Sequence, residues 1–192
     1  MLKGNQSEIL SCIAVGGGGD PAAPAPQQRG VDSGPSDGDA RKLGAAARAL
    51  AVQRKNVVVM TGKTDYITAG DAVLAVDNGH EYLGMVTGTG CCLGTTISAY
   101  VAAATPATED ADDEEGNRGE KDSDGNHRLA AVLAAVLHYS IAAELAAERD
   151  DVRGPGTFVP AFLDELCNVR KATVNGDLEW LKRAKVSVLP ID

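Results

Sequence analysis

The fold is decided by the stretch Asn56-Val57-Val58-Val59-Met60-Thr61-Gly62, a continuous apolar run that ends in glycine. A short apolar run bounded by a chain breaker is typical of a β-strand that is buried on both faces. Segments rich in helix-forming residues lie on both sides of this strand, at 37–55 and 91–104. A buried strand between helices predicts an α/β layered fold.

The rest of the chain supplies further elements of this fold. Tyr66-Ile67-Thr68 and Val73-Leu74-Ala75-Val76 flank Ala69-Gly70-Asp71, which predicts a hairpin. Helices are expected over 5–15, 129–149, 157–171 and 178–185, and a last strand over 186–189. A sheet with helices on both faces normally has about five or six strands, and only 57–62 has the character of a central strand. We therefore expect the C-terminal portion of a larger domain, with its first strands upstream of Met1 and absent.

Two segments have compositions that do not favour burial of apolar surface. Residues 16–39 are rich in glycine and proline and open with four consecutive glycines. Residues 106–126 hold an acidic run, 109–124, that carries −7 of the net charge of −9. We expect both to be disordered insertions within one partial domain that occupies 1–192. Because no basic patch offsets the acidity, the sequence argues against nucleic-acid binding.

The overall composition is that of an ordinary globular chain. Hydrophobic residues make up 44% and charged residues 23% of the 192 residues. No apolar run approaches the roughly 18–20 residues that a membrane span requires, and the first residues lack the pattern of a signal peptide. Four cysteines, two of them adjacent, do not make a disulfide framework. These features predict a cytoplasmic protein without a membrane partner.

The motif Val86-Thr87-Gly88-Thr89-Gly90-Cys91-Cys92-Leu93-Gly94 stands directly before an apolar helix. Glycine permits the backbone angles that turn successive N–H groups toward an anion, and a helix N-terminus adds partial positive charge. The motif therefore predicts a phosphate cradle, in which the same field would favour the thiolate of Cys91. The alternative is a plain loop followed by two small, buried cysteines.

Two other segments have a structural and a functional interpretation. In Asn5-Gln6-Ser7-Glu8, asparagine at a helix cap with glutamate three residues later is a variant of the capping box. The functional alternative makes Glu8 a carboxylate that orients Mg²⁺ or its waters. Thr61-Gly62 stands where strands of open α/β sheets meet ligands, although glycine after a strand is also ordinary.

Taken in order, these pieces resemble the hydroxyethylthiazole kinase family of ribokinase-like proteins, and most closely the kinase half of the fungal bifunctional enzymes that also carry thiamine-phosphate synthase. The resemblance extends from residue 3 to about residue 170. The matching segments are Lys3-Gly4-Asn5-Gln6-Ser7-Glu8-Ile9-Leu10, Arg29-Gly30-Val31-Asp32-Ser33, Val57-Val58-Val59-Met60-Thr61-Gly62-Lys63-Thr64-Asp65-Tyr66-Ile67, Asn78-Gly79-His80, Val86-Thr87-Gly88-Thr89-Gly90-Cys91 and Gly154-Pro155-Gly156-Thr157-Phe158.

The resemblance implies a ribokinase-like α/β/α fold and an activity. The activity is the transfer of the γ-phosphate of ATP, with Mg²⁺, to the primary hydroxyl of 4-methyl-5-(2-hydroxyethyl)thiazole, for thiamine phosphate biosynthesis or salvage. It also implies a homotrimer whose active sites lie between subunits. Because the family's first half is absent, we expect little activity from the 192 residues alone.

The resemblance also implies roles for individual residues. Gly88 to Cys91 would form an anion hole beside the substrate hydroxyl, with Gly88 and Cys91 contacting the thiazole alcohol and Gly90 the nucleotide. Cys91 would be the catalytic residue, at a position where most ribokinase-like relatives carry an aspartate base. Asn5 and Glu8 would organise phosphates and Mg²⁺ respectively. Thr61 would contact the nucleotide, as would Lys3, which replaces the arginine of many members and lacks its bidentate fork.

Two other functions remain open at this point. One is another ribokinase-like enzyme, such as a phosphomethylpyrimidine kinase or a nucleotide-dependent hydrate-repair dehydratase, although Cys91 in place of aspartate argues against both. The other is a non-catalytic nucleotide-binding remnant that retains the phosphate-binding loop.

Overall fold

The computed structural model describes residues 1–16, 40–105 and 121–191. Most of the two predicted insertions, 16–39 and 106–126, therefore lies outside the described residues. The exceptions are Gly16, which ends a helix, and residues 121–126, which belong to one. Residues 121–126 form the first turns of α5 (Lys121–Ala147), so this helix begins before its predicted start at residue 129. The helical pattern extends further toward the N-terminus than its apolar residues do.

A five-stranded sheet forms the centre of the molecule, with the strands in the order β1-β2-β3-β4-β5. The strands are β1 (Leu2–Asn5), β2 (Val58–Thr61), β3 (Asp65–Thr68), β4 (Val73–Val76) and β5 (Val186–Leu189). β1 runs parallel to β2, and every later pair is antiparallel. The predicted hairpin is confirmed as β3–β4, and the predicted last strand as β5.

Six helices and one 3₁₀ turn are found among the described residues. They are α1 (Gln6–Gly16), α2 (Ala40–Arg54), α3 (Tyr82–Met85), α4 (Thr89–Ala104), α5 (Lys121–Ala147), α6 (Pro155–Val174) and η1 (Glu179–Arg183). The sequence did not predict α3, which is a single turn. A helix was predicted over 178–185, but only the 3₁₀ turn η1 forms there, and the backbone is already extended at Ala184 before β5 begins.

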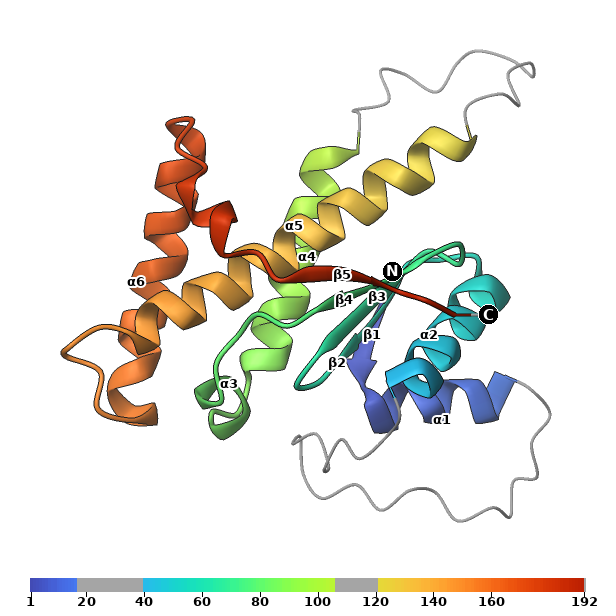
Figure 1. Ribbon diagram of the computed structural model, residues 1–192, viewed down its shortest axis with the longest axis horizontal. Helices are drawn as coiled ribbons and strands as arrows, with labels where there is room; N and C mark the ends of the chain where they lie inside the picture. The colour runs from blue at the N-terminus through green and yellow to red at the C-terminus, as the bar shows by residue number, and fades with distance from the viewer. Residues whose placement is uncertain (17–39, 106–120, 192) are drawn as a thin grey trace.

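Helices cover both faces of the sheet, as the buried strand predicts. Alternate residues of β2 enter different cores, since successive side chains of a strand point to opposite faces. Val58 and Met60 pack with α1 and α2, whereas Val57 and Val59 pack with α4, α5 and α6. Figure 1 shows α1 and α2 on one side of the sheet and α4 and α5 on the other. This is the α/β/α layering that the resemblance implies.

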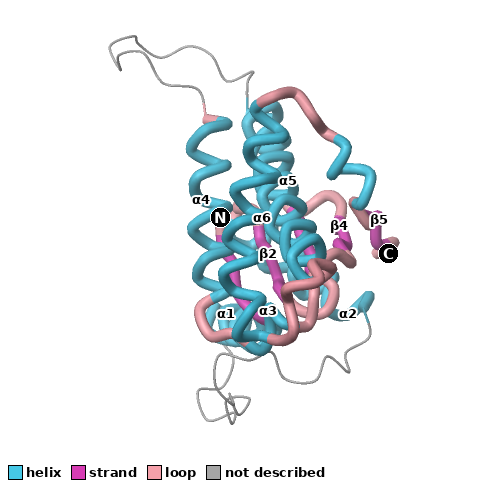
Figure 2. The backbone as a smooth tube through the Cα atoms, turned by 90° about the vertical axis from the view of Figure 1, so that its left-hand side faces the viewer, coloured by secondary structure: helices cyan, strands magenta, loops and turns pink. Residues whose placement is uncertain are grey.

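The helix α5 corrects one reading of the sequence. Its segment Asn126–Ala147 has a mean hydropathy of 1.8 and is long enough to cross a membrane, so an apolar run of sufficient length does exist. However, 72% of its most apolar window is buried inside the protein. Figure 2 shows α4, α5 and α6 running side by side. Packing between two helices and against β3 accounts for the apolar character of α5.

Candidate functional site

The predicted site residues gather where two parallel strands end and one helix begins. Asn5 and Thr61 are register partners at the carboxyl ends of β1 and β2. The Thr61 hydroxyl donates to the carbonyl oxygen of Gly4 at 3.3 Å, which ties the two strand ends together. The carboxyl ends of parallel strands are where α/β folds place ligands.

Lys3 connects these strand ends to the first turn of α4. A Cβ atom placed on Gly90 would lie 3.1 Å from Nζ of Lys3, and one on Gly94 would lie 3.9 Å from its Cδ. The lysine side chain therefore extends along the surface of α4 that its two glycines leave open. Two residues separated by 87 positions in the sequence are brought together in this way, as a shared site requires.

Asn5 and Glu8 form a complete capping box at the start of α1. The amide of Asn5 donates to Oε2 of Glu8 at 2.7 Å, and the amide of Glu8 donates to Oδ1 of Asn5 at 2.9 Å. Gly4 leaves room for this fold-back, because a Cβ there would lie 2.9 Å from Cβ of Glu8. The structural interpretation of this segment is thus confirmed. The second carboxylate oxygen, Oε1, makes no hydrogen bond to the described residues, so capping does not occupy the whole group.

The turn that leads into α4 has an unusual backbone. Gly88 caps the helix with φ of 99°, in the left-handed region that favours glycine. The Thr89 hydroxyl donates to the carbonyl oxygens of Leu83 at 2.7 Å and Val86 at 3.1 Å, which braces the loop before the helix. No well-formed hydrogen bond from the amides of residues 88–91 is found within the described part of the chain. These amides are the free donors that an anion needs.

Cys91 and Cys92 lie in the first turn of α4, and both are exposed. The alternative that treated them as small buried residues is therefore wrong. Both are free thiols, as are the exposed Cys12 and Cys167. An exposed thiol at this helix end can reach a bound substrate, which a packed cysteine could not do.

Asp65 is a residue of this region that sequence reasoning missed. Its side chain, in a residue only 8% exposed, accepts a hydrogen bond from the amide of Gly62 at 3.0 Å. Burial raises its pKa to about 7, against the opposing effects of the Gly62 amide and of Lys3, while Asp77 adds to the rise. Its position three residues after Gly62, close to the end of that strand, was the signal available in the sequence.

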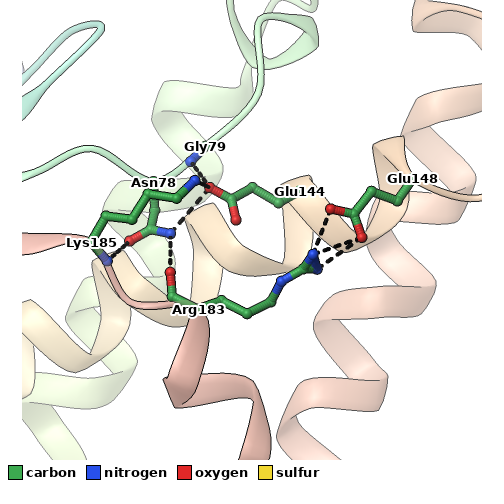
Figure 3. Close-up of polar contacts among 6 residues, drawn as sticks. All are labelled: Asn78, Gly79, Glu144, Glu148, Arg183 and Lys185. Carbon is green, nitrogen blue, oxygen red and sulfur yellow. Dashed lines mark hydrogen bonds and ion pairs between the residues drawn. The ribbon is translucent and has the colours of Figure 1, made fainter.

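A second polar cluster lies away from this site, around Asn78 (Figure 3). Nδ2 of Asn78 donates to Oε1 of Glu144 at 3.1 Å and to the carbonyl oxygen of Arg183 at 2.9 Å, and Oδ1 accepts from the amide of Lys185 at 2.7 Å. Nζ of Lys185 and the amide of Gly79 also donate to Glu144 Oε1, at 3.0 and 3.1 Å. The cluster joins the loop after β4 to α5 and to the segment before β5.

A cavity of about 460 Å³ opens beside this second cluster. Glu144, Glu148, Arg183 and Lys185 are among the residues that line it. Arg183 pairs with Glu148, and Lys185 pairs with Glu144, so both acids in the lining are already matched by cations. The cavity contains none of the predicted site residues.

Comparisons with known proteins show which family the chain resembles. A model of the hydroxyethylthiazole kinase family matches residues 1–114. The "Probable thiamine biosynthetic bifunctional enzyme" of Schizosaccharomyces pombe is 32% identical over 97% of the chain, which corresponds to 31% of the yeast protein. The solved structure of the hydroxyethylthiazole kinase protein from Pyrococcus horikoshii OT3 superposes with a TM-score of 0.67 at 26% identity, over 98% of this chain and 54% of the other.

The layered sheet and its match to the archaeal structure thus define the class of proteins with the ribokinase-like fold. Within that class, the chain belongs to the hydroxyethylthiazole kinase family. It spans about half of the archaeal structure and about a third of the yeast relative.

Proposed function

We propose that this chain carries part of a hydroxyethylthiazole kinase, which uses ATP to phosphorylate the primary hydroxyl of 4-methyl-5-(2-hydroxyethyl)thiazole for thiamine phosphate synthesis. Membership of the family, with ATP and a small-molecule acceptor as the implied substrates, supports the proposal. The bifunctional yeast relative supports a link to thiamine-phosphate synthase. The observation that carries the proposal is the placement of Lys3 beside the free amides of the first turn of α4.

Under this proposal the start of α4 is the anion hole. Phosphoryl transfer depends mainly on positioning and on neutralising charge at the transferred group. The amides of residues 88–91 supply fixed donors, and the ammonium of Lys3 supplies a full positive charge beside Gly90. A lysine next to the positive end of a helix is electrostatically unfavourable unless an anion lies near both groups. Bound phosphate would resolve this repulsion.

The remaining roles are those that the resemblance to the family implies. Gly88 and Cys91 would contact the thiazole alcohol, and the exposed side chain of Cys91 would take the hydroxyl proton as the phosphoryl group transfers. Gly90, Lys3, Asn5 and Thr61 would contact the nucleotide. Because the primary hydroxyl needs to lose its proton only late in the transfer, a modest base is sufficient.

Glu8 would hold Mg²⁺. In the part of the chain that the structure describes, no group of three or more acidic, histidine or cysteine side chains forms a ready-made metal cage. Mg²⁺ does not need one, since it keeps several waters and takes few protein ligands. The Oε1 atom of Glu8, left open by the capping box, fits this mode of binding. Bound there, the ion would neutralise charge on the phosphates of ATP.

We also propose that the complete kinase site needs chain beyond this sequence and is built in a trimer. About half of the archaeal structure has no counterpart here, and β1 pairs with only one strand among the described residues. A kinase assay would therefore use the chain alone and the chain supplied with the part of the yeast kinase that it does not cover. Light scattering would report the oligomeric state of each.

The assay measures phosphate transfer from ATP to the thiazole alcohol and, in parallel, to a phosphomethylpyrimidine. In the mixture that contains the missing part of the kinase, we expect transfer to the thiazole alcohol. Turnover should be lost in Cys91→Ser and unchanged in Cys92→Ser, which alters the neighbouring exposed thiol. ATP binding by calorimetry without transfer in either mixture would identify a non-catalytic remnant. Preference for the pyrimidine would refute the proposed substrate. Equal turnover in Cys91→Ser, Cys91→Asp and wild type would refute the role of Cys91.

A further inference from the structure

Tyr139, in the middle of α5, contacts the first turn of α4. Its hydroxyl donates a 2.7 Å hydrogen bond to the carbonyl oxygen of Thr89, the first residue of that helix. The tyrosine is only 2% exposed. Thr89 lies 50 residues away along the chain, so this bond is a direct tertiary link between the core and the phosphate-binding turn.

The accepting carbonyl shares a peptide unit with the amide of Gly90. The carbonyl of Thr89 and the N–H of Gly90 lie in one plane and point in opposite directions. A hydrogen bond that fixes the carbonyl oxygen therefore fixes the direction of this N–H group. The Gly90 amide is one of the free donors beside Lys3.

The ring of Tyr139 is itself held in place by aromatic packing. Phe162 of α6 meets it edge to face, with ring centroids 4.9 Å apart at 87°. Phe158 stacks on Phe162 at 5.3 Å. Burial raises the pKa of Tyr139, with a smaller contribution from the thiols of Cys92 and Cys91, so the hydroxyl remains a donor. The hydroxyl has little freedom to move away from Thr89.

We propose that Tyr139 is a positioning residue for phosphoryl transfer, which acts through the Thr89–Gly90 peptide unit and aims the Gly90 amide at the transferring group. The inference rests on the proposed kinase function. It adds a residue outside the phosphate-binding turn, on a different helix, to the machinery of that turn.

The test compares Tyr139→Phe with Tyr100→Phe in the full chain. Phenylalanine at 139 keeps the ring that packs on Phe162 and removes only the hydroxyl. Tyr100, further along α4, shares a 2.6 Å hydrogen bond with Nδ1 of His138, so its variant also loses one tyrosine hydrogen bond, but away from the phosphate-binding turn. Amide resonances of Gly90 are recorded by NMR, and kcat and the KM for ATP are measured in the kinase assay described above.

We expect the Gly90 amide resonance to shift or broaden in Tyr139→Phe and to stay unchanged in Tyr100→Phe. We also expect kcat to fall about three- to tenfold in Tyr139→Phe, with little change in KM, as the loss of one aimed hydrogen bond predicts. Equal behaviour of the two variants, in the Gly90 resonance or in kcat, would overturn the proposal.

The two proposals fail in different ways. If wild type transfers no phosphate in any mixture, the kinase function is refuted. The role of Tyr139 in transfer is then refuted too, even if the Gly90 amide resonance differs between Tyr139→Phe and Tyr100→Phe. If wild type transfers phosphate and the variants do not differ, only the role of Tyr139 falls.

Discussion

Replacing Asp65 by asparagine should change how the stability of this protein depends on pH. The pKa of Asp65 is raised from 3.8 to about 7 in the folded chain, chiefly by burial. Between these values the folded state binds more protons than the unfolded state, so stability falls as pH rises. Asparagine removes the titration but retains an oxygen for the Gly62 amide, which donates to Asp65 at 3.0 Å.

The magnitude follows from the two pKa values. Integrating the linkage from pH 5.5 to pH 8 gives a loss of about 2 kcal/mol in wild type that the variant does not share, at 1.36 kcal/mol per pH unit between the two pKa values. Most of this loss occurs below pH 7, where the carboxyl is still largely protonated in the folded state but ionised in the unfolded state. Above that pH the difference between wild type and Asp65→Asn should level off.

Urea denaturation at four pH values from 5.5 to 8 measures this difference directly. The control is Asp71→Asn, which changes an exposed aspartate in the turn between β3 and β4 of the same sheet. Its free energy of unfolding should follow wild type at every pH. If Asp65→Asn also follows wild type in parallel, Asp65 is not a buried acid with a raised pKa, and the reasoning is refuted.

Two other substitutions test the site and the polar cluster. Gly90→Ala should weaken ATP binding, measured by calorimetry, several-fold, because the added Cβ would lie 3.1 Å from Nζ of Lys3. The control Gly156→Ala adds a Cβ with no atom within 4 Å and should leave the affinity unchanged. Equal affinities of the two variants would contradict the placement of Lys3. Asn78→Ala should lower the free energy of unfolding by about 2–3 kcal/mol, because it removes the three hydrogen bonds of a buried side chain. The exposed Asn168→Ala should cost far less, and similar losses in the two variants would show that the cluster contributes little.

The sequence predicts the centre of the fold better than its edges. The apolar run that forms β2 and the turn residues between β3 and β4 are strong local signals, and both predictions are confirmed. β1 has no such signal, since three of its four residues are Lys3-Gly4-Asn5 and only pairing with β2 makes it a strand. The start of α5 was missed because its first turns are polar.

The residues of the candidate site also differ in whether a local sequence pattern predicts them. The turn before α4 could be found from its glycines, and the capping box from the spacing of Asn5 and Glu8. Asp65 and Tyr139 could not be identified from local patterns, because burial and partners distant in the chain determine what they do. In the sequence, an aspartate three residues after a glycine resembles an ordinary turn residue, whereas the structure buries Asp65.

The central claim is that the amides entering α4 hold the transferring phosphoryl group. A crystal structure with Mg²⁺ and a non-hydrolysable ATP analogue tests it most directly. We predict γ-phosphate oxygens about 2.7–3.2 Å from amide nitrogens of residues 88–91, with Nζ of Lys3 beside them. Phosphates bound elsewhere, such as in the cavity beside Lys185, with these amides facing only water, would contradict the claim.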